Sequence, residues 1–214
     1  MKFPIVVMLV ASLTFVSCSG GGSDLPPIFT TQILSDPVYD GDIALGFVSG
    51  TYTVTQTNTQ VVFAGIDPAT LDEYRAFLDF YLGGPGGVPL NAGIASATLD
   101  IFINDILPTT GTIPMRIDLV YFQPPNLIST DFDRTIQPAL ASITFPIFQS
   151  DFGQHVVIDV TSLMREAQRL GLPDFQVRIM EDLGQVDPGI IEIDDTTIPA
   201  DRPFFAPLLE VAYY

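Results

Sequence analysis

The sequence has very few residues of the types that catalysis and metal binding most often use. It has no tryptophan, one histidine (His155) and one cysteine (Cys18). A single cysteine cannot form an internal disulfide, and one histidine with one cysteine cannot supply the ligands of an ordinary zinc site. The sequence also has no Gly-x-Ser-x-Gly motif to present a serine nucleophile. We therefore expect a protein that is not an enzyme.

Positive charge is also scarce. Lys2 is the only lysine, and seven arginines stand against 25 acidic residues, for a formal net charge of −17. Such a chain is not expected to bind nucleic acid or to dock on anionic lipid through its charge. With 47% hydrophobic residues, the composition is that of a folded domain rather than a disordered one. The acidity favours solubility outside the cytoplasm and is compatible with divalent cations.

The N-terminus has the layout of a secretory signal peptide. Lys2 precedes an almost wholly apolar run from Ile5 to Val16, and the sequence becomes polar after Cys18. This run is shorter than the about 20 residues of an ordinary membrane-spanning helix, although a short membrane anchor remains the alternative interpretation. The sequence therefore predicts an exported protein.

The end of this segment resembles the lipobox of bacterial lipoproteins. The motif is Phe15-Val16-Ser17-Cys18, with phenylalanine where leucine is usual. The resemblance implies cleavage before Cys18, acylation of its thiol, and attachment to the cell envelope through lipid. Because Ser19 rather than aspartate follows the cysteine, we expect the outer membrane, at its periplasmic face or at the cell surface. We predict a signal peptide over 1–17, a flexible Gly/Ser-containing tether over 18–35 and one domain over 36–214.

Short apolar segments punctuated by Gly, Pro, Asn and Asp predict an all-β domain. One helix is expected, over residues 161–170, because Gly171 and Pro173 end it and Thr161 or Ser162 offers a cap. The absence of β-α-β crossovers favours two stacked antiparallel sheets, a jelly-roll-like β-sandwich. The expected strands are 43–48, 51–55, 61–64, 74–82, 95–103, 115–122, 156–160, 175–181, 189–193 and 208–213.

The order of these segments resembles the DNRLRE-type β-sandwich domains, which include the CBM96-like carbohydrate-binding modules. The matching motifs are the strand over 75–80, a Gly/Pro loop, the strand over 94–99, Asp159-Val160-Thr161 before the helix, and the strand over 207–213. The resemblance covers roughly residues 36–214. It implies extracellular binding or structural roles without catalysis. The absence of tryptophan is a departure, because aromatic platforms stack on sugar rings.

Acidic residues offer one candidate metal site. Asp36, Asp40 and Asp42 cluster before a predicted strand, with Gly41 permitting a tight turn, and calcium prefers such hard oxygen ligands. The alternative is that they are turn residues forming Asx-turns, and apart from calcium we expect no cofactor. Further acidic pairs lie at 131/133 and 194/195. His155 is read as a strand-edge residue rather than as part of a catalytic triad.

The sequence leaves two functions open. The first is a lipid-anchored structural, assembly or adhesion protein whose partners are the membrane and an envelope protein. The second is a carbohydrate-binding lipoprotein, with calcium as a conceivable aid. Aromatic pairs at 121/122, 204/205 and 213/214 either pack in the core or form a surface for a glycan or protein partner. No ligand-binding residue is assigned from the sequence.

Overall fold

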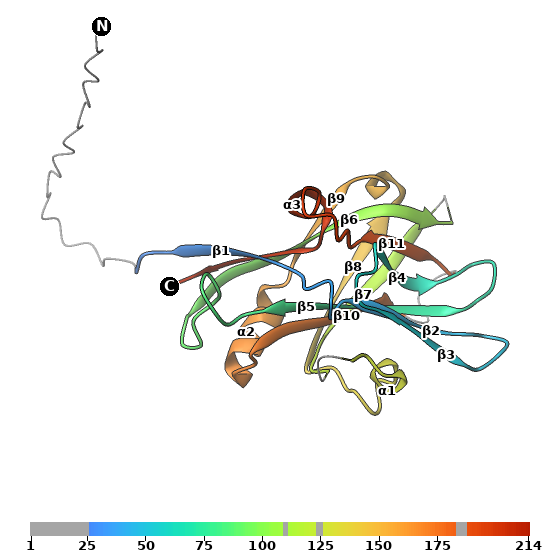
Figure 1. Cartoon of the computed structure of the whole chain (residues 1–214), viewed down its shortest axis with the longest axis horizontal. Helices are drawn as coiled ribbons and strands as arrows, with labels where there is room; N and C mark the ends of the chain where they lie inside the picture. Colours follow the sequence, from blue (N-terminus) through green and yellow to red (C-terminus); the bar gives the residue numbers. More distant parts are fainter. Residues whose placement is uncertain (1–25, 109–110, 123–125, 183–187) are drawn as a thin grey trace, which may run out of the picture.

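The chain folds into two layers of antiparallel β-strands (Figure 1). The computed structural model describes residues 26–108, 111–122, 126–182 and 188–214, so the predicted signal peptide and Cys18 lie outside the described residues. No helix among these described residues is long and apolar enough to cross a membrane. The strands are β1 (Phe29–Leu34), β2 (Gly41–Leu45), β3 (Tyr52–Gln56), β4 (Val61–Ile66), β5 (Glu73–Tyr81), β6 (Ile94–Leu107), β7 (Thr112–Val120), β8 (Ala141–Phe148), β9 (His155–Asp159), β10 (Asp174–Glu181), β11 (Ile190–Asp194) and β12 (Leu208–Tyr213).

The two layers are continuous through the long strand β6. Its first part pairs with β12 and β9, and β12 pairs with β1. Its last part pairs with β11, which leads through β4, β5, β10 and β7 to β8 in the second layer. Strand β2 pairs with β5 on one side and with β3 on the other. The prediction of an all-β, sandwich-like fold is confirmed, as a single sheet that curls into two layers.

The main core lies between the layers and follows the predicted alternation. Leu99, Ile101 and Ile103 of β6 are fully buried, as are Leu78 and Phe80 of β5. Each such side chain contributes about 1.5–3 kcal/mol through burial of apolar surface. Helix α2 (Thr161–Leu170) packs against this core with Leu163, Met164 and Ala167.

The predicted helix is confirmed over its whole length, but its N-terminal hydrogen bonding differs from the prediction. Neither Thr161 nor Ser162 caps the helix: its N-cap position is Val160, and the Asp159 carboxylate accepts the backbone N–H of Thr161 at 2.9 Å. The Thr161 hydroxyl instead accepts the backbone N–H of Ala97 at 2.9 Å, which joins the helix start to β6. At the other end Gly171 has a left-handed conformation (φ 66°), as a glycine C-cap requires.

A second, smaller core lies on the outer face of the second layer. The connection from β7 to β8 crosses this face and contains the one-turn helix α1 (Ser129–Phe132). Phe77 alternates along β5 with the main-core residues Ala76 and Leu78 and so lies on the other face of the strand, yet this side chain is also fully buried. The members of this cluster are Ile43, Phe77, Val120, Phe122, Leu127 and Phe132. The outer face is therefore covered rather than exposed to solvent.

Two strands and two short helices were not predicted. Strand β1 lies in the predicted tether but pairs with β12 along its whole length, so the folded domain begins before residue 36. Strand β8 was missed because Pro146 interrupts its pattern; the strand tolerates proline because it pairs only with β7 and lies at an edge. The short helices are α1 and α3 (Arg202–Phe205).

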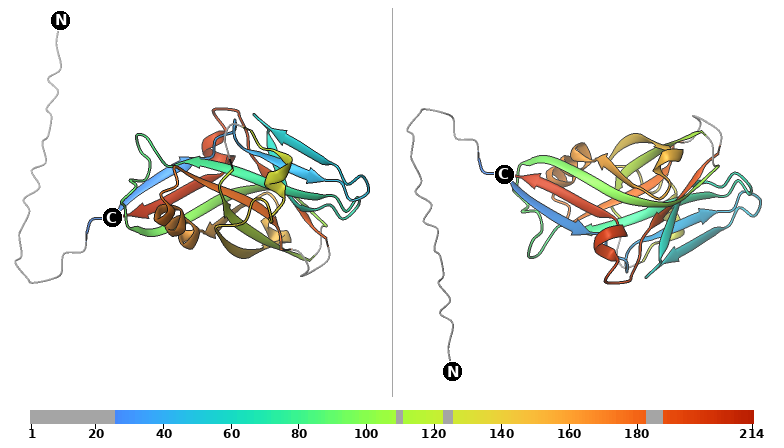
Figure 2. Two further views of the ribbon diagram at one scale, coloured as in Figure 1. Left: turned by 90° about the horizontal axis from the view of Figure 1, so that it is seen from below. Right: turned by 90° about the horizontal axis from the view of Figure 1, so that it is seen from above.

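The molecule is elongated, and its two ends differ. Strand β1 begins next to the C-terminus at one end (Figures 1 and 2). The β2–β3 hairpin runs outward along the long axis and turns at the opposite end, beside the β4–β5 loop. The Asp72 carboxylate of that loop accepts the backbone N–H of Phe47 at the hairpin turn, at 2.8 Å. We call this the distal end.

Candidate functional site

The three predicted calcium ligands have separate partners. The Asp36 carboxylate accepts the backbone N–H of Val38 at 2.9 Å, which is the Asx-turn given as the alternative. Asp40 is fully buried and accepts the backbone N–H of Asp79 at 2.7 Å. Asp42 is buried on β2. Among the described residues, no three His, Cys, Asp or Glu side chains form a group that would hold a metal ion. Calcium binding stays a prediction.

Asp40 instead pairs with Asp195, which follows β11. Both carboxyl groups are fully buried, and Thr59 donates a hydroxyl hydrogen bond to Asp195 at 3.1 Å. One oxygen of each, Asp40 Oδ2 and Asp195 Oδ1, has no donor among the described residues. Burial raises the pKa of both groups, and the neighbouring charge of Asp195 raises the pKa of Asp40 further. Two neighbouring buried carboxyl groups favour a state in which one of them is protonated.

Two further buried carboxyl groups have pKa values above the usual range. Burial raises the pKa of Asp42 to about 6, although a hydrogen bond from the Phe63 backbone opposes the shift. Burial also raises the pKa of Asp79 to about 6, although Gln176 donates to its Oδ2 at 2.6 Å. Their effect is on stability as a function of pH.

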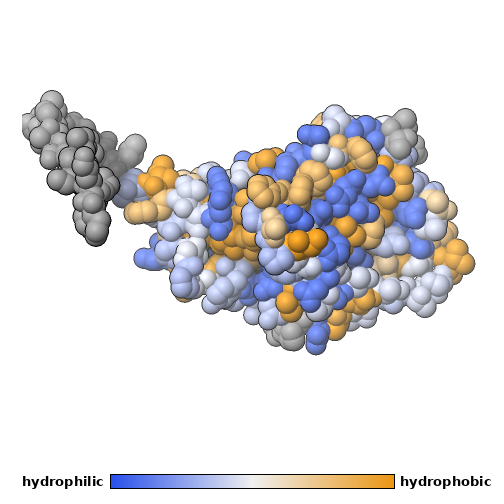
Figure 3. Space-filling model, turned by 45° about the horizontal axis from the view of Figure 1, so that its top comes forward, coloured by the Kyte–Doolittle hydropathy of each residue, from blue (hydrophilic) through white to orange (hydrophobic). Residues whose placement is uncertain are grey.

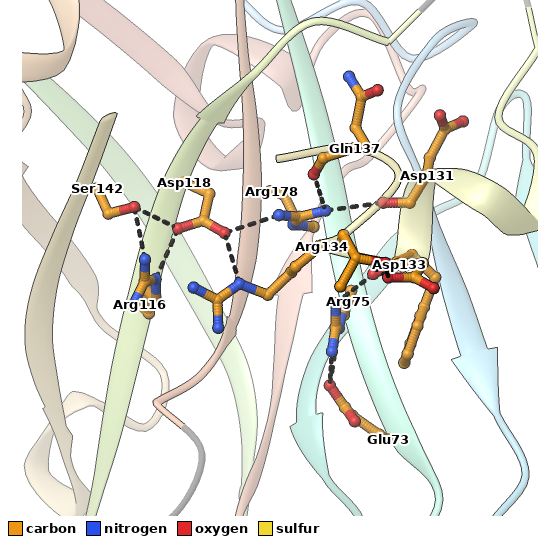
Figure 4. Close-up of polar contacts among 12 residues, drawn as sticks. Glu73, Arg75, Arg116, Asp118, Asp131, Asp133, Arg134, Gln137, Ser142 and Arg178 are labelled. Carbon is orange, nitrogen blue, oxygen red and sulfur yellow. Dashed lines mark hydrogen bonds and ion pairs between the residues drawn. The ribbon is translucent and has the colours of Figure 1, made fainter. Parts of the chain in front are cut away.

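The densest polar cluster surrounds Asp118 on the outer face of the second layer (Figure 4). Arg178 and Asp118 form a fully buried ion pair at 2.8 Å. Arg116 contacts the same carboxylate at 2.6 Å and Arg134 approaches it at 3.6 Å. Burial by itself would raise the pKa of Asp118, but hydrogen bonds from Arg116, Ser142 and Arg178 outweigh it and lower the pKa below its usual range. These partners therefore favour the ionised form of the Asp118 carboxyl group.

The same cluster holds the β7–β8 connection against the sheet. Arg178 Nη1 donates to the carbonyl oxygens of Asp131 at 2.8 Å and Gln137 at 3.2 Å. Arg75 donates to the carbonyl of Phe132 and stacks 3.8 Å from the centre of its ring. Arg75 and Arg178 thus each donate through Nη1 to backbone carbonyls of the β7–β8 connection. These contacts have a structural role, because they fix α1 over the second core (Figure 4).

The predicted strand-edge histidine is exposed on β9. His155 Nδ1 lies 3.0 Å from Asp100 Oδ1, and its ring meets the edge of Phe102. The aromatic pairs divide between core and surface. Phe122 is buried, whereas the exposed members are Tyr121, Phe204 and Tyr214.

The distal end carries exposed apolar side chains. At the hairpin turn, Phe47 is 66% exposed and Val48 is 92% exposed. We define the distal surface as the exposed residues of the hairpin and the neighbouring loop: Phe47, Val48, Tyr52, Val54 and Leu71. Figure 3 shows hydrophobic side chains at this end of the molecule. Exposed apolar groups gathered at a projecting tip are typical of an interaction site.

The distal hairpin also lacks charge. No Asp, Glu, Lys or Arg lies between Asp42 and Asp67, a stretch that includes all of β3. Strand β3 pairs only with β2, so its other edge has no strand partner within the described part of the chain. All its residues except Gln56 are exposed. An uncharged, exposed edge strand is a surface onto which another strand can add.

A groove of about 750 Å³ lies at the seam between β8 and β9, beside α2. Phe145 and Val157 supply apolar lining, and Arg165 lies at its wall, where the guanidinium is fixed by the backbone carbonyls of Ile94 and Ala95. The polar lining is Ser96, Thr144, Asp159, Thr161 and Ser162. A concave site with an aromatic ring and several hydroxyl groups has the size and chemistry for a small polar ligand.

Compared with known proteins, the sequence matches no family model and no curated protein. The resemblance to DNRLRE-type domains therefore rests on the motifs of this chain.

Sequence reasoning did not find the distal surface or the groove. One signal for the distal surface was present, because the absence of charge from Ile43 to Ile66 stands out in so acidic a chain. The groove had no such signal: its residues come from β6, β8, β9 and α2, and only the fold brings them together.

Proposed function

We propose that the protein is a lipid-anchored, non-catalytic component of the cell envelope whose role is structural assembly or adhesion. The observation that carries the proposal is the exposed apolar distal surface at one end of an elongated domain, where the hairpin turn and β3 carry no charged residue. Cys18, the expected lipid attachment site, precedes β1, which begins at the other end (Figure 1). An anchor at one end and an exposed apolar surface at the other suit a module held out toward a protein partner.

Two features support the proposal further. The largest polar cluster is used to hold a connection in place, and its carboxylate is engaged by three arginines. The buried pair Asp40 and Asp195 is closed to solvent and has no exposed surface at which a substrate would bind. The acidic remainder of the surface favours solubility, so the uncharged hairpin is the surface on which a partner meets least repulsion.

Photo-crosslinking in the exporting cell tests this function. A photoreactive phenylalanine analogue replaces Phe47, and in a second variant it replaces Phe204, which is matched in residue type and is 65% exposed against 66% for Phe47. We expect a discrete crosslinked product from position 47 and none from position 204. Equal yields at both positions, or no product at position 47, would contradict the proposal.

The groove beside α2 supports a second function, carbohydrate binding. Its size, its hydroxyl groups and the ring of Phe145 are the features that favour it. We expect that Ser162→Trp, which fills the groove, abolishes any binding on a glycan array. Binding that survives this substitution, or a wild-type protein that binds no glycan, would exclude the groove as a sugar site.

A further inference from the structure

Strand β3 differs from the other edge strands in having neither proline nor charge. The edge strand β8 contains Pro146, and β9 carries His155 and Asp159. The β1 edge is met by the β5–β6 loop, since the Thr31 hydroxyl donates to the carbonyl of Gly86. Proline, charge and covering loops are the devices that normally stop edges from pairing. Strand β3 has neither proline nor charge, and the β7–β8 connection covers only part of it, through the contact of the Tyr52 and Phe132 rings at 5.3 Å and the hydrogen bond from the Leu127 backbone N–H to the Gln56 side chain at 2.9 Å. No described strand pairs with its outer backbone edge, which leaves that edge open to another strand.

The free edge presents a regular set of backbone groups. The backbone N–H of Gly46 donates to the carbonyl of Thr51 at 3.0 Å, which fixes the alternation of the hairpin ladder. In an antiparallel ladder this alternation directs the backbone groups of Thr53 and Thr55 toward β2. The N–H and C=O groups of Tyr52, Val54 and Gln56 therefore point away from β2.

We propose that β3 pairs antiparallel with β3 of a second copy of this chain, about a twofold axis at Val54. This inference rests on the proposed function and names its partner. The strand is nearly symmetric about its centre, so the axis places Val54 against Val54, Thr53 against Thr55 and Tyr52 against Gln56. Threonine pairs and β-branched pairs favour such cross-strand contacts, and a twofold interface closes without further growth.

The absence of charge on β3 permits a second copy of this acidic chain as the partner. Two chains of net charge −17 repel each other, and the repulsion is least where neither carries a charge. The uncharged stretch from Ile43 to Ile66 meets this condition and contains the whole of the free edge. The same stretch offers no attraction to a basic or an acidic partner, so shape and backbone pairing decide what binds.

The pairing has a directional consequence. The hairpin runs along the long axis of the molecule (Figures 1 and 2), and antiparallel pairing therefore sets the two long axes in opposite directions. The ends at which β1 begins then lie at opposite ends of the dimer. With lipid at Cys18 of each copy, the dimer joins two facing membrane surfaces rather than two neighbours on one surface. One strand pair is a small interface, and display of many copies on a membrane makes it effective.

A disulfide trap tests the register. In the mature chain with Cys18→Ser, which has no other cysteine, Val54→Cys places two thiols across the axis with Cα atoms about 5.5 Å apart, a distance that a disulfide spans. Val48→Cys is the control, because it is more exposed but lies at the turn. We expect a disulfide-linked dimer to form at least about tenfold faster from Val54→Cys, because pairing raises the effective concentration of its thiol. Equal rates, or a monomeric Val54→Cys chain, overturn the proposal.

Vesicle clustering tests the direction of pairing. Vesicles that carry the acylated wild-type protein are expected to cluster, as measured by light scattering. Val54→Lys should abolish clustering, whereas Leu170→Lys should leave it intact, because it makes an equal change of charge at an apolar side chain of α2 that is 39% exposed against 38% for Val54. Clustering that survives Val54→Lys, or wild-type vesicles that stay dispersed, overturns the inference. If the Phe47 crosslink in cells then contains a different protein, the proposed function stands without the self-pairing; if Phe47 gives no crosslink, both fail.

Discussion

At the scale of single residues, the fold buries several carboxyl groups, and burial raises their pKa values. Burial raises the pKa of Asp40 and Asp195, and it raises the pKa of Asp42 and Asp79 to about 6. In the unfolded chain the same groups ionise near pH 4. Between these values the folded protein binds more protons than the unfolded chain, so folding stability decreases as pH rises through 6.

The first prediction concerns this pH dependence. The pKa shift at Asp42 or at Asp79 corresponds to about 3 kcal/mol of folding stability. This contribution is present below pH 4 and is lost as pH rises above 6. We expect a higher melting temperature at pH 5 than at pH 8. Asp40→Asn should reduce the difference, because an amide donates to Asp195 as the protonated acid does and still accepts from the Asp79 backbone.

The control for this prediction is Asp36→Asn. Asparagine also forms the Asx-turn at Val38, so this variant should keep the full difference between pH 5 and pH 8. If the melting temperature of the wild type rises from pH 5 to pH 8, the buried carboxyl groups do not govern the pH dependence of its stability.

At the scale of elements, the β7–β8 connection is attached mainly by arginine. Arg178 joins Asp118 on β7 to the carbonyls of Asp131 and Gln137 in the connection. The polar contacts and the small core beneath α1 thus hold the same segment. Loss of this attachment would expose the apolar residues under it.

The second prediction is that Arg178→Met destabilises the protein by about 3–5 kcal/mol, because it leaves a buried carboxylate with fewer partners. Adding Asp118→Asn should restore part of this loss, since the unpaired charge is removed. Arg169→Met is the control: its ion pair with Glu166 lies on the exposed face of α2 and should contribute nothing measurable. Urea unfolding measures all three. Equal losses for Arg178→Met and Arg169→Met would contradict a role for burial.

At the scale of the whole molecule, the two ends have different tasks in the proposed function. One end begins with β1 and follows the expected lipid site, and the other presents the distal surface (Figure 2). The acidic surface between them keeps the domain soluble. In the proposed function, the position of the expected anchor decides how the distal surface is presented.

The third prediction concerns the anchor. The mature protein extracted from membranes should begin at Cys18 and carry added acyl mass, as intact-mass measurement will show. Cys18→Ser should release the domain from the membrane fraction without changing its melting temperature, because the folded domain begins downstream of the anchor. A mature chain that begins elsewhere and carries no acyl mass would refute lipidation.

The amino-acid sequence determined the local structure of this protein. Alternation of apolar residues was enough to predict ten of the strands, and the Gly171 end of α2 was predicted because a left-handed cap and a following proline are local features. The expected export signal and lipobox are also linear motifs, and they stay predictions, because they lie outside the described residues.

Only the tertiary structure decided which residues meet. Asp40 was grouped with its sequence neighbours Asp36 and Asp42, but the carboxyl group that acts on it is that of Asp195, which is distant in the sequence and is brought near by the fold. Arg178 and Asp118 likewise join β10 to β7. The free edge of β3 became visible once its pairing with β2 alone was known. A strand pattern shows which side chains face inward, whereas burial of charge and exposure of a strand edge depend on contacts between distant segments.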